Sequence, residues 1–455
     1  MRKHLWFLLL LFSCAFVFSS VGCAESGQRA EDDMSYQAYL LKAAELPRIP
    51  PCPDMSDPSG LDEEKLAQYA AWWEAKAEQQ RIVIPGVEQI QDFVRESTRE
   101  FAADQEKSNF LYSPVSLWLC LNTLSDMAEG DSRAQIQRVI GQLPEGEQDA
   151  QSDAVFRSLY WEGDGAVCTP ANSVWLNTGT SMSETLLKQL AARAHSSVFQ
   201  GEMGESAFDE ALQGWLNEQT RGLLKDSVSG LGFSSDAGLA VCSTLYMKNG
   251  WSLPFGKSKT APDVFHTDTG EVTTDFMHSS GTGVVYGGDG FSAVLLDLSD
   301  GGSVAFILPE EGRSPEELLK ADDLFRFLFA GRNWEDGRQG KIKLSIPKMD
   351  CLTGMSLRSA LEKMGITDIF DPQKARFSAE IMSDAALAVT TLQQYARLIL
   401  NEEGVEAAAI TITLDGAMLI RPEDEIDFTL NRPFVYAVLS DKGIPLFIGT
   451  YHVPE

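Results

Sequence analysis

The segment from Asn401 to Leu414 constrains the fold of this chain more than any other, because its composition suits two structural states. Its last part alternates isoleucine and threonine, which is typical of a β-strand with two different faces. Before that lies a run of small residues, Ala407 to Ala409, that can fit between existing strands. Gly404 supplies a flexible backbone pivot. Such a segment is suited to be an exposed loop in one state and a sheet strand in another.

This segment resembles the hinge of the serpins, which trap serine proteases by inserting a reactive loop into their own β-sheet. The family hinge reads glutamate, any residue, glycine, a small residue, glutamate and three alanines. The corresponding hinge residues here are Glu402, Gly404, Val405, Glu406, Ala407, Ala408 and Ala409. For this motif alone, the alternative is an ordinary helix or strand that carries two acidic residues.

Other motifs resemble those of serpins and keep the family's order from about Gln89 to Glu455. They are Ser113-Pro114-Val115-Ser116 at the start of the shutter helix, Lys248-Asn249-Gly250-Trp251 with Pro254-Phe255 at the breach, Phe306 to Pro309, Ile346-Pro347-Lys348, Met364 to Phe370, Asn431 to Phe434 and Pro445 to Gly449. Each motif alone is weak, but the ordered set is specific. The resemblance implies an α+β serpin fold with a large mixed central β-sheet, two smaller sheets, about nine helices and an exposed reactive-centre loop at about 402–427.

Hydrophobic patterning predicts helices and strands along the chain, and long stretches of strand lie apart from the early helices, which favours an α+β fold. The apolar segment 116–127 is expected to be a buried helix. Further helices are predicted at 91–104, 185–194 and 208–220, and strands at 173–176, 239–248, 293–298, 303–308, 341–346, 434–439 and 446–451.

The N-terminal region differs from the rest of the chain. A basic start, an apolar run to Val17 and then small residues are typical of a secretory signal peptide over 1–22. Val21-Gly22-Cys23 resembles a bacterial lipoprotein cleavage box, so Cys23 is expected to carry a lipid anchor on an extracellular, cell-surface protein, with plain secretion as the alternative. Residues 23–86 are predicted to form a spacer with one helix at 61–81, ahead of a serpin domain at 87–455.

Composition and motifs narrow the function classes. The net charge of −29 disfavours nucleic acid and unaided binding to anionic membranes. The seven cysteines have no spacing typical of a disulfide framework or zinc site, so neither metal nor cofactor is expected. The chain lacks a Gly-x-Ser-x-Gly elbow, a phosphate-binding glycine loop and a His-Glu-x-x-His motif, which disfavours an enzyme.

The resemblance implies a suicide-substrate mechanism by a monomer, with a serine protease or a cysteine protease as the partner. Counting from Gly404 places the scissile bond at Met418-Leu419, whereas counting back from Asn431 places it at Leu419-Ile420. Both registers offer an uncharged apolar side chain. Elastase-, chymotrypsin- and subtilisin-like proteases are therefore favoured over trypsin-like ones.

Insertion would bury alternate side chains of the loop, beginning with Val405. The set predicted to become buried is Val405, Ala407, Ala409, Thr411 and Thr413. None is charged or large, as an inhibitor requires, because an unpaired buried charge would stall insertion. A non-inhibitory serpin that binds or stores a ligand is the rival interpretation. The opposite face carries Ile410, Ile412 and Leu414, which have no role here beyond contacts with protease or neighbours.

Two positions depart from the family's shutter, the polar network under the opening sheet. Serpins commonly have asparagine and histidine where this chain has Ser243 and Gln394, whereas the shutter serines Ser113 and Ser116 are retained. A polar network under a moving sheet must stay satisfied in both states, so we expect a re-wired network. Trp251 is expected at the breach, where the loop first enters the sheet.

Overall fold

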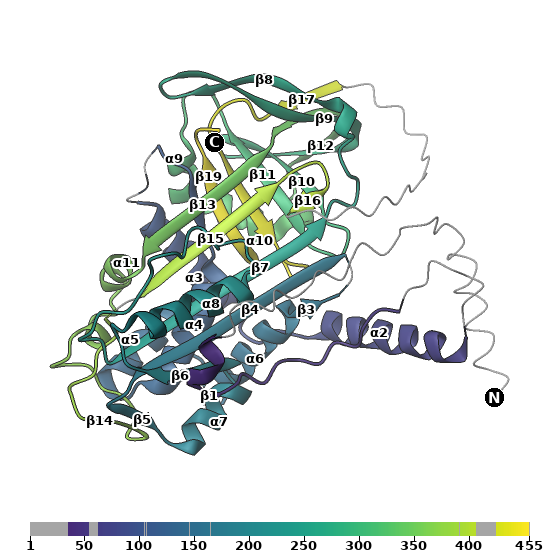
Figure 1. Cartoon of the computed structure of the whole chain (residues 1–455). Coiled ribbons are helices and arrows are strands. Elements are labelled where there is room, and N and C mark those ends of the chain that lie inside the picture. The colour runs from purple at the N-terminus through teal and green to yellow at the C-terminus, as the bar shows by residue number, and fades with distance from the viewer. Residues whose placement is uncertain are drawn as a thin grey trace.

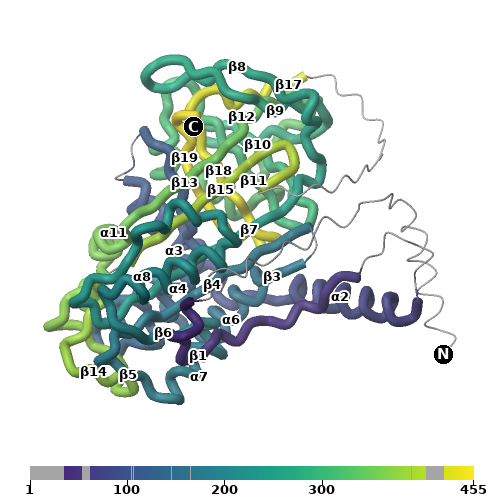
Figure 2. The backbone as a smooth tube through the Cα atoms, in the orientation of Figure 1, coloured from purple at the N-terminus to yellow at the C-terminus, as the bar shows by residue number. Residues whose placement is uncertain are grey.

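The computed structural model describes residues 35–53, 62–103, 105, 107–144, 146–163, 165–390, 392–405 and 425–454, and Figures 1 and 2 show their arrangement. Ten α-helices lie within these ranges. They are α2 (Glu63–Arg81), α3 (Val87–Ala102), α4 (Pro114–Met127), α5 (Gly130–Ile140), α6 (Glu147–Leu159), α7 (Glu184–Ala192), α8 (Ser206–Gln219), α9 (Pro315–Lys320), α10 (Asp322–Ala330) and α11 (Arg358–Lys363). All five helices expected from the sequence are confirmed, with small shifts at their ends.

The central sheet has eight strands in the order β1-β6-β4-β7-β16-β15-β13, with β3 paired to β4. It is mixed, because β4 and β6 are parallel and the other neighbours are antiparallel. Its strands are β1 (Leu40–Lys42), β3 (Trp161–Glu162), β4 (Ala166–Asn177), β6 (Ser196–Gly201), β7 (Leu239–Gly250), β13 (Met349–Ser356), β15 (Gln393–Leu400) and β16 (Gly404–Val405).

A second sheet has nine strands. Its 19-residue strand β9 pairs with β8, β12 and β10 along successive parts of its length. Its strands are β2 (Phe110–Tyr112), β8 (Thr260–Thr267), β9 (Gly270–Gly288), β10 (Phe291–Asp297), β11 (Ser303–Pro309), β12 (Gly337–Pro347), β17 (Glu425–Thr429), β18 (Phe434–Leu439) and β19 (Pro445–Tyr451). A separate two-stranded antiparallel sheet pairs β5 (Thr180–Met182) with β14 (Ile381–Ser383).

Two apolar layers cover the faces of the central sheet. On one face, α4 is buried almost throughout, as its apolar sequence predicts, and its residues join the main core with those of β7 and β19. On the other face, α8 packs through Phe208 and Trp215 against Trp175 and Phe199 of the sheet. A strand inserted between β7 and β15 would therefore meet a different layer on each face.

The N-terminal segment contributes to the fold in a way that the sequence did not suggest. Tyr36 in the 3₁₀ helix η1 (Ser35–Tyr39) is buried against Phe199, and its hydroxyl donates to Glu218 of α8. Strand β1 then pairs with β6 at the edge of the central sheet. The expected spacer helix is present as α2, which begins at the N-cap Asp62.

Candidate functional site

The hinge is already seated in the central sheet. Val405 pairs with Leu400 of β15 and with Asn249 of β7, and Gly404 pairs with Gly250. The Val405 side chain is only 1% exposed and belongs to the main core. The expectation that Val405 becomes buried only after cleavage is therefore wrong, because Gly404 and Val405 already occupy the strand position.

Gly404 fits this position because the backbone of β7 approaches it closely. Its φ of +152° lies in a region that favours glycine. An added Cβ would lie 2.3 Å from the Asn249 carbonyl oxygen and 2.6 Å from the Gly250 Cα. A larger residue would push the hinge away from the strand.

Glu402 anchors the chain next to the hinge strand through two side-chain contacts. It is 8% exposed, lies 3.3 Å from Lys348 Nζ and accepts a 2.8 Å hydrogen bond from the Thr260 hydroxyl. Burial alone would raise the pKa of Glu402, but its hydrogen bonds and the Lys348 charge lower the pKa below its usual value. The sequence did not identify Thr260, and Lys348 appeared only within the Ile346-Pro347-Lys348 motif, without a role.

Trp251 lies beside the residues that lead into the hinge strand. Its indole Nε1 donates to the Asn401 carbonyl over 2.8 Å, and its backbone N–H donates to the Glu403 carbonyl over 2.9 Å. Lys257 Nζ lies 2.5 Å from the Glu403 carboxylate. The three residues before the hinge strand, Asn401 to Glu403, are thus each held by a contact with the rest of the fold.

The four shutter residues meet at the N-terminus of α4, but as two separate pairs. The Ser243 hydroxyl donates to the Ser116 carbonyl over 3.0 Å, and the two hydroxyls are 2.8 Å apart. The Gln394 amide donates to the Ser113 carbonyl over 3.0 Å and accepts from the Ser113 N–H over 2.8 Å. Among the described residues, the Ser113 hydroxyl has no hydrogen-bond partner. Ser243 and Gln394 thus connect the two strands beside the hinge to one helix end.

Helix α2 contacts the loop that supports the hinge strand. The buried Lys76 ammonium lies 2.6 Å from the Asp300 carboxylate and 4.1 Å from the centre of the Trp161 ring. The Asp300 N–H donates to the Asn249 side chain, whose backbone pairs with Val405. The sequence predicted the helix but not this contact.

Several predicted site residues lie outside the described residues. They are the hinge residues Glu406, Ala407, Ala408 and Ala409, the reactive-bond residues Met418, Leu419 and Ile420, and the lipidation residue Cys23. Within the described ranges, no helix has the length and apolarity needed to cross a membrane. In the same part of the chain, no three histidine, cysteine or acidic side chains gather to hold a metal ion, and Cys120, Cys168 and Cys242 are free thiols.

Comparison with known proteins places this geometry in a family. The chain is 28% identical over 387 residues to an uncharacterised serpin-like protein of Thermococcus kodakarensis, covering 82% of this chain and 86% of that protein. It is 25% identical to alpha-1-antiproteinase of Rattus norvegicus (79% and 87% covered) and 28% identical to corticosteroid-binding globulin of Pongo abelii (76% and 85% covered).

The fold matches the native crystal structure of the thermophilic serpin tengpin with a TM-score of 0.69 at 23% identity, over 80% of this chain and 93% of tengpin. The family model described as "Serpin (serine protease inhibitor)" matches residues 88–454. Because this match spans most of the chain in a single stretch, the protein belongs to the serpin family.

Proposed function

We propose that this serpin is an inhibitor that traps a serine protease as a covalent acyl-enzyme. The observation that carries the proposal is the hinge, because Val405 already pairs with both β7 and β15, and Gly404 pairs with β7. An inserting strand that starts from this nucleus extends an existing ladder, so it does not have to open a closed sheet edge. The residues that the sequence predicts to become buried on insertion, alternate positions from Val405 to Thr413, are uncharged, which supports the same function.

In this mechanism the reactive-centre loop is attacked as a substrate. The protease serine oxygen would form an ester with the carbonyl of Met418 or Leu419, the peptide bond to the next residue would break, and the new amine would leave with the serine proton. Insertion of the cleaved strand would then carry the tethered protease away and distort its active site before water hydrolyses the ester.

The proposed targets are elastase-, chymotrypsin- or subtilisin-like proteases, because both candidate bait residues are apolar. Incubation with a panel of these enzymes should give a one-to-one complex that survives denaturing electrophoresis. The released C-terminal peptide should begin at Leu419 or Ile420, as mass spectrometry would show. A trypsin-like protease should give little complex.

The rival is a serpin that binds a ligand without inhibiting, as the name of the related corticosteroid-binding globulin indicates for that protein. Clean cleavage of the loop by every protease in the panel, with no covalent adduct, would favour this rival. Complexes with cysteine proteases, which form thioesters, would extend the target class.

A cell-surface location is a separate proposal, based on Val21-Gly22-Cys23. We propose that Cys23 carries lipid in a bacterial lipoprotein and that the monomeric inhibitor is displayed outside the cell. Cys23→Ala should then move the protein from the membrane fraction of its host to the medium. Unchanged fractionation would indicate plain secretion or another anchor.

A further inference from the structure

Helix α2 is held to the body of the molecule through a charged side chain. All 19 of its residues are described, and Lys76, which is 6% exposed, is the one that is buried. The helix itself projects from the body beside α6 and β3 (Figure 1). Lysine is rarely buried, because the ammonium is costly to desolvate unless it is paired. The site that receives Lys76 must therefore be able to hold a cation.

Three segments of the body contribute to this site. The Lys76 Nζ lies 2.6 Å from the Asp300 carboxylate and 4.1 Å from the centre of the buried Trp161 ring. Asp441 lies in the turn between β18 and β19, which touches the β10–β11 turn that carries Asp300. A Cβ added at Gly301 of that turn would lie only 3.2 Å from the Asp441 Cβ. We call Trp161, Asp300 and Asp441 the ammonium socket.

The electrostatics of the socket favour an occupied state. Burial raises the pKa of Asp441, the Lys442 and Lys76 charges lower this pKa, and the Asp300 charge raises it. Without a cation, the two carboxylates would repel each other in adjacent turns. An ammonium relieves this repulsion, donates to Asp300 and lies over the Trp161 ring, whose face attracts cations.

The socket and its occupant come from different parts of the chain. The three socket residues lie within the serpin part, residues 88–454, whereas Lys76 precedes it. The last turns of α2 make further contacts with the body. The Gln79 amide donates to the Ser158 and Tyr160 carbonyls over 3.1 and 3.0 Å, and the half-buried Trp72 ring lies 5.7 Å from the Trp161 ring. These contacts bury no apolar side chain of α2 completely, so the buried cation is the main anchor.

We propose that the ammonium socket is a binding site for lysine side chains, which Lys76 fills at rest and which a lysine of a partner protein enters when α2 leaves. The ligand class is a primary ammonium on an unbranched alkyl chain. The inference does not depend on protease inhibition. The Asp300 N–H also donates to the Asn249 side chain over 3.2 Å, so a partner lysine would bind beside the strand that holds the hinge.

Rescue of Lys76→Ala by n-butylammonium tests the socket, because this cation has the four-carbon chain and the ammonium of lysine. The variant should melt at a lower temperature than the wild type. At about ten times its dissociation constant, n-butylammonium should raise the melting temperature of the variant by about 2 °C, since it binds only the folded state. Tetramethylammonium at the same ionic strength should give no rescue, because it has no N–H to donate to Asp300.

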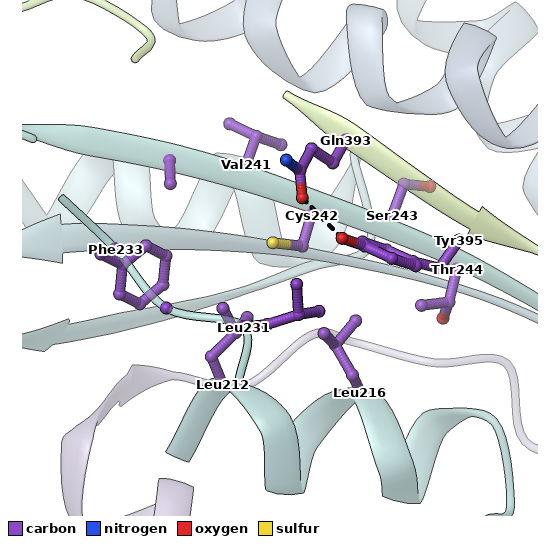
Figure 3. A pocket seen from close by; sticks show the side chains of 12 residues that line it. Leu212, Leu216, Leu231, Phe233, Val241, Cys242, Ser243, Thr244, Gln393 and Tyr395 are labelled. Carbon is purple, nitrogen blue, oxygen red and sulfur yellow. Dashed lines mark hydrogen bonds between the residues drawn. The ribbon is translucent and has the colours of Figure 1, made fainter. Parts of the chain in front are cut away.

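Two controls locate the binding. Asp300→Asn in the Lys76→Ala background keeps the backbone N–H but removes the counter-charge, so the rescue should disappear. n-Butanol carries the same chain without a charge and should not rescue. It reports binding to apolar space such as the cavity of about 40 Å³ between α8 and the strands β7 and β15 (Figure 3), whose lining includes Leu212 and Phe233 and no acidic residue. No rescue by n-butylammonium, or an equal rescue in either control, would overturn the inference.

Hydrogen exchange of the wild-type protein tests whether α2 can be displaced, and it does not require Lys76→Ala to fold. With saturating n-butylammonium, the α2 amides should exchange at least about tenfold faster than with tetramethylammonium, because a released helix frays. The amides of α3 should keep their rate. Unchanged exchange in α2 would show that Lys76 is a permanent part of the fold, and it would overturn the role of the socket as a site for partners.

Discussion

At the scale of single residues, Val405 holds the resting hinge in the central sheet, and the proposed insertion would start from it. Val405→Arg should turn the inhibitor into a substrate, because an unpaired buried charge costs several kcal/mol and about 1.4 kcal/mol on the insertion barrier shifts the competition with deacylation tenfold. Since Val405 is already buried, the variant should also melt at a lower temperature than the wild type. The measurements are the inhibitor-to-protease ratio and thermal unfolding. Val83→Arg is the control, because Val83 is 83% exposed, and an equal effect of both variants would contradict the prediction.

Ionised Glu316 should account for part of the stability that the fold loses in acid. Burial alone would raise its pKa, but contact with His452 Nε2 at 2.9 Å and the Lys107 backbone N–H lowers the pKa from 4.5 to about 2. Its charged form therefore stabilises the fold above about pH 4.5, and this contribution is lost as the pH falls toward 2. In denaturant titrations across that range, Glu316→Gln should flatten the loss of stability, whereas the exposed Glu317→Gln should not.

At the scale of elements, the two-residue strand β16 depends on Gly404. Gly404→Ala should lower stability by about 1–3 kcal/mol and expel the hinge, because both φ and the β7 backbone oppose a Cβ. Gly270→Ala is the matched control, with φ of +151° and no atom within 4 Å of its Cβ. If both variants lose the same stability by thermal unfolding, steric contact with β7 is not what fixes the hinge.

The shutter joins β7 and β15 through the N-terminus of α4. We expect Ser243→Asn and Gln394→His to destabilise singly and to compensate in the double variant, with a coupling energy of about 0.5–3 kcal/mol. The coupling must pass through Ser113 and Ser116, since each substituted residue bonds to one of these serines. A double-mutant cycle in denaturant measures it, and additive effects would show that the two pairs are independent.

The elements that sequence patterning predicted are those with a strong apolar signal, such as α4 and β18. Strand β9 was missed because most of its residues are exposed or half-buried, so that its pattern has no apolar face. Strand β1 was missed because three residues are too few to show a period. For the site, local motifs identified Gly404 and Trp251. Thr260 at the start of β8 and Lys348 between β12 and β13 reach Glu402 from distant parts of the chain, and only the tertiary fold brings them together. Period-two alternation also cannot show which residues of neighbouring strands lie opposite each other. For the hinge strand, this register came from the pairing of Val405 with Asn249.

At the scale of the whole molecule, the N-terminal helix α2 is tied to the serpin body through Lys76 and Asp300. Lys76→Met should lower the free energy of unfolding by about 1–3 kcal/mol, because Asp300 loses a charged hydrogen-bond partner. It should also change the inhibitor-to-protease ratio, since Asp300 bonds to Asn249 beside the hinge. Lys65→Met on the same helix is the control. A stability loss without any change in the ratio would limit the contact to a structural role.

The position of β1 has a mechanical consequence. Tension that arrives from the N-terminal side of Ser35 first meets Tyr36, which is buried in the aromatic layer and bonded to α8 through Glu218. The load then passes into β1 and β6 at one edge of the central sheet, with β4 and β7 between them and the hinge strand. A molecule pulled by its N-terminus would therefore absorb the force in shear at that edge, and the position between β7 and β15, where the hinge strand lies, would remain mechanically isolated from it.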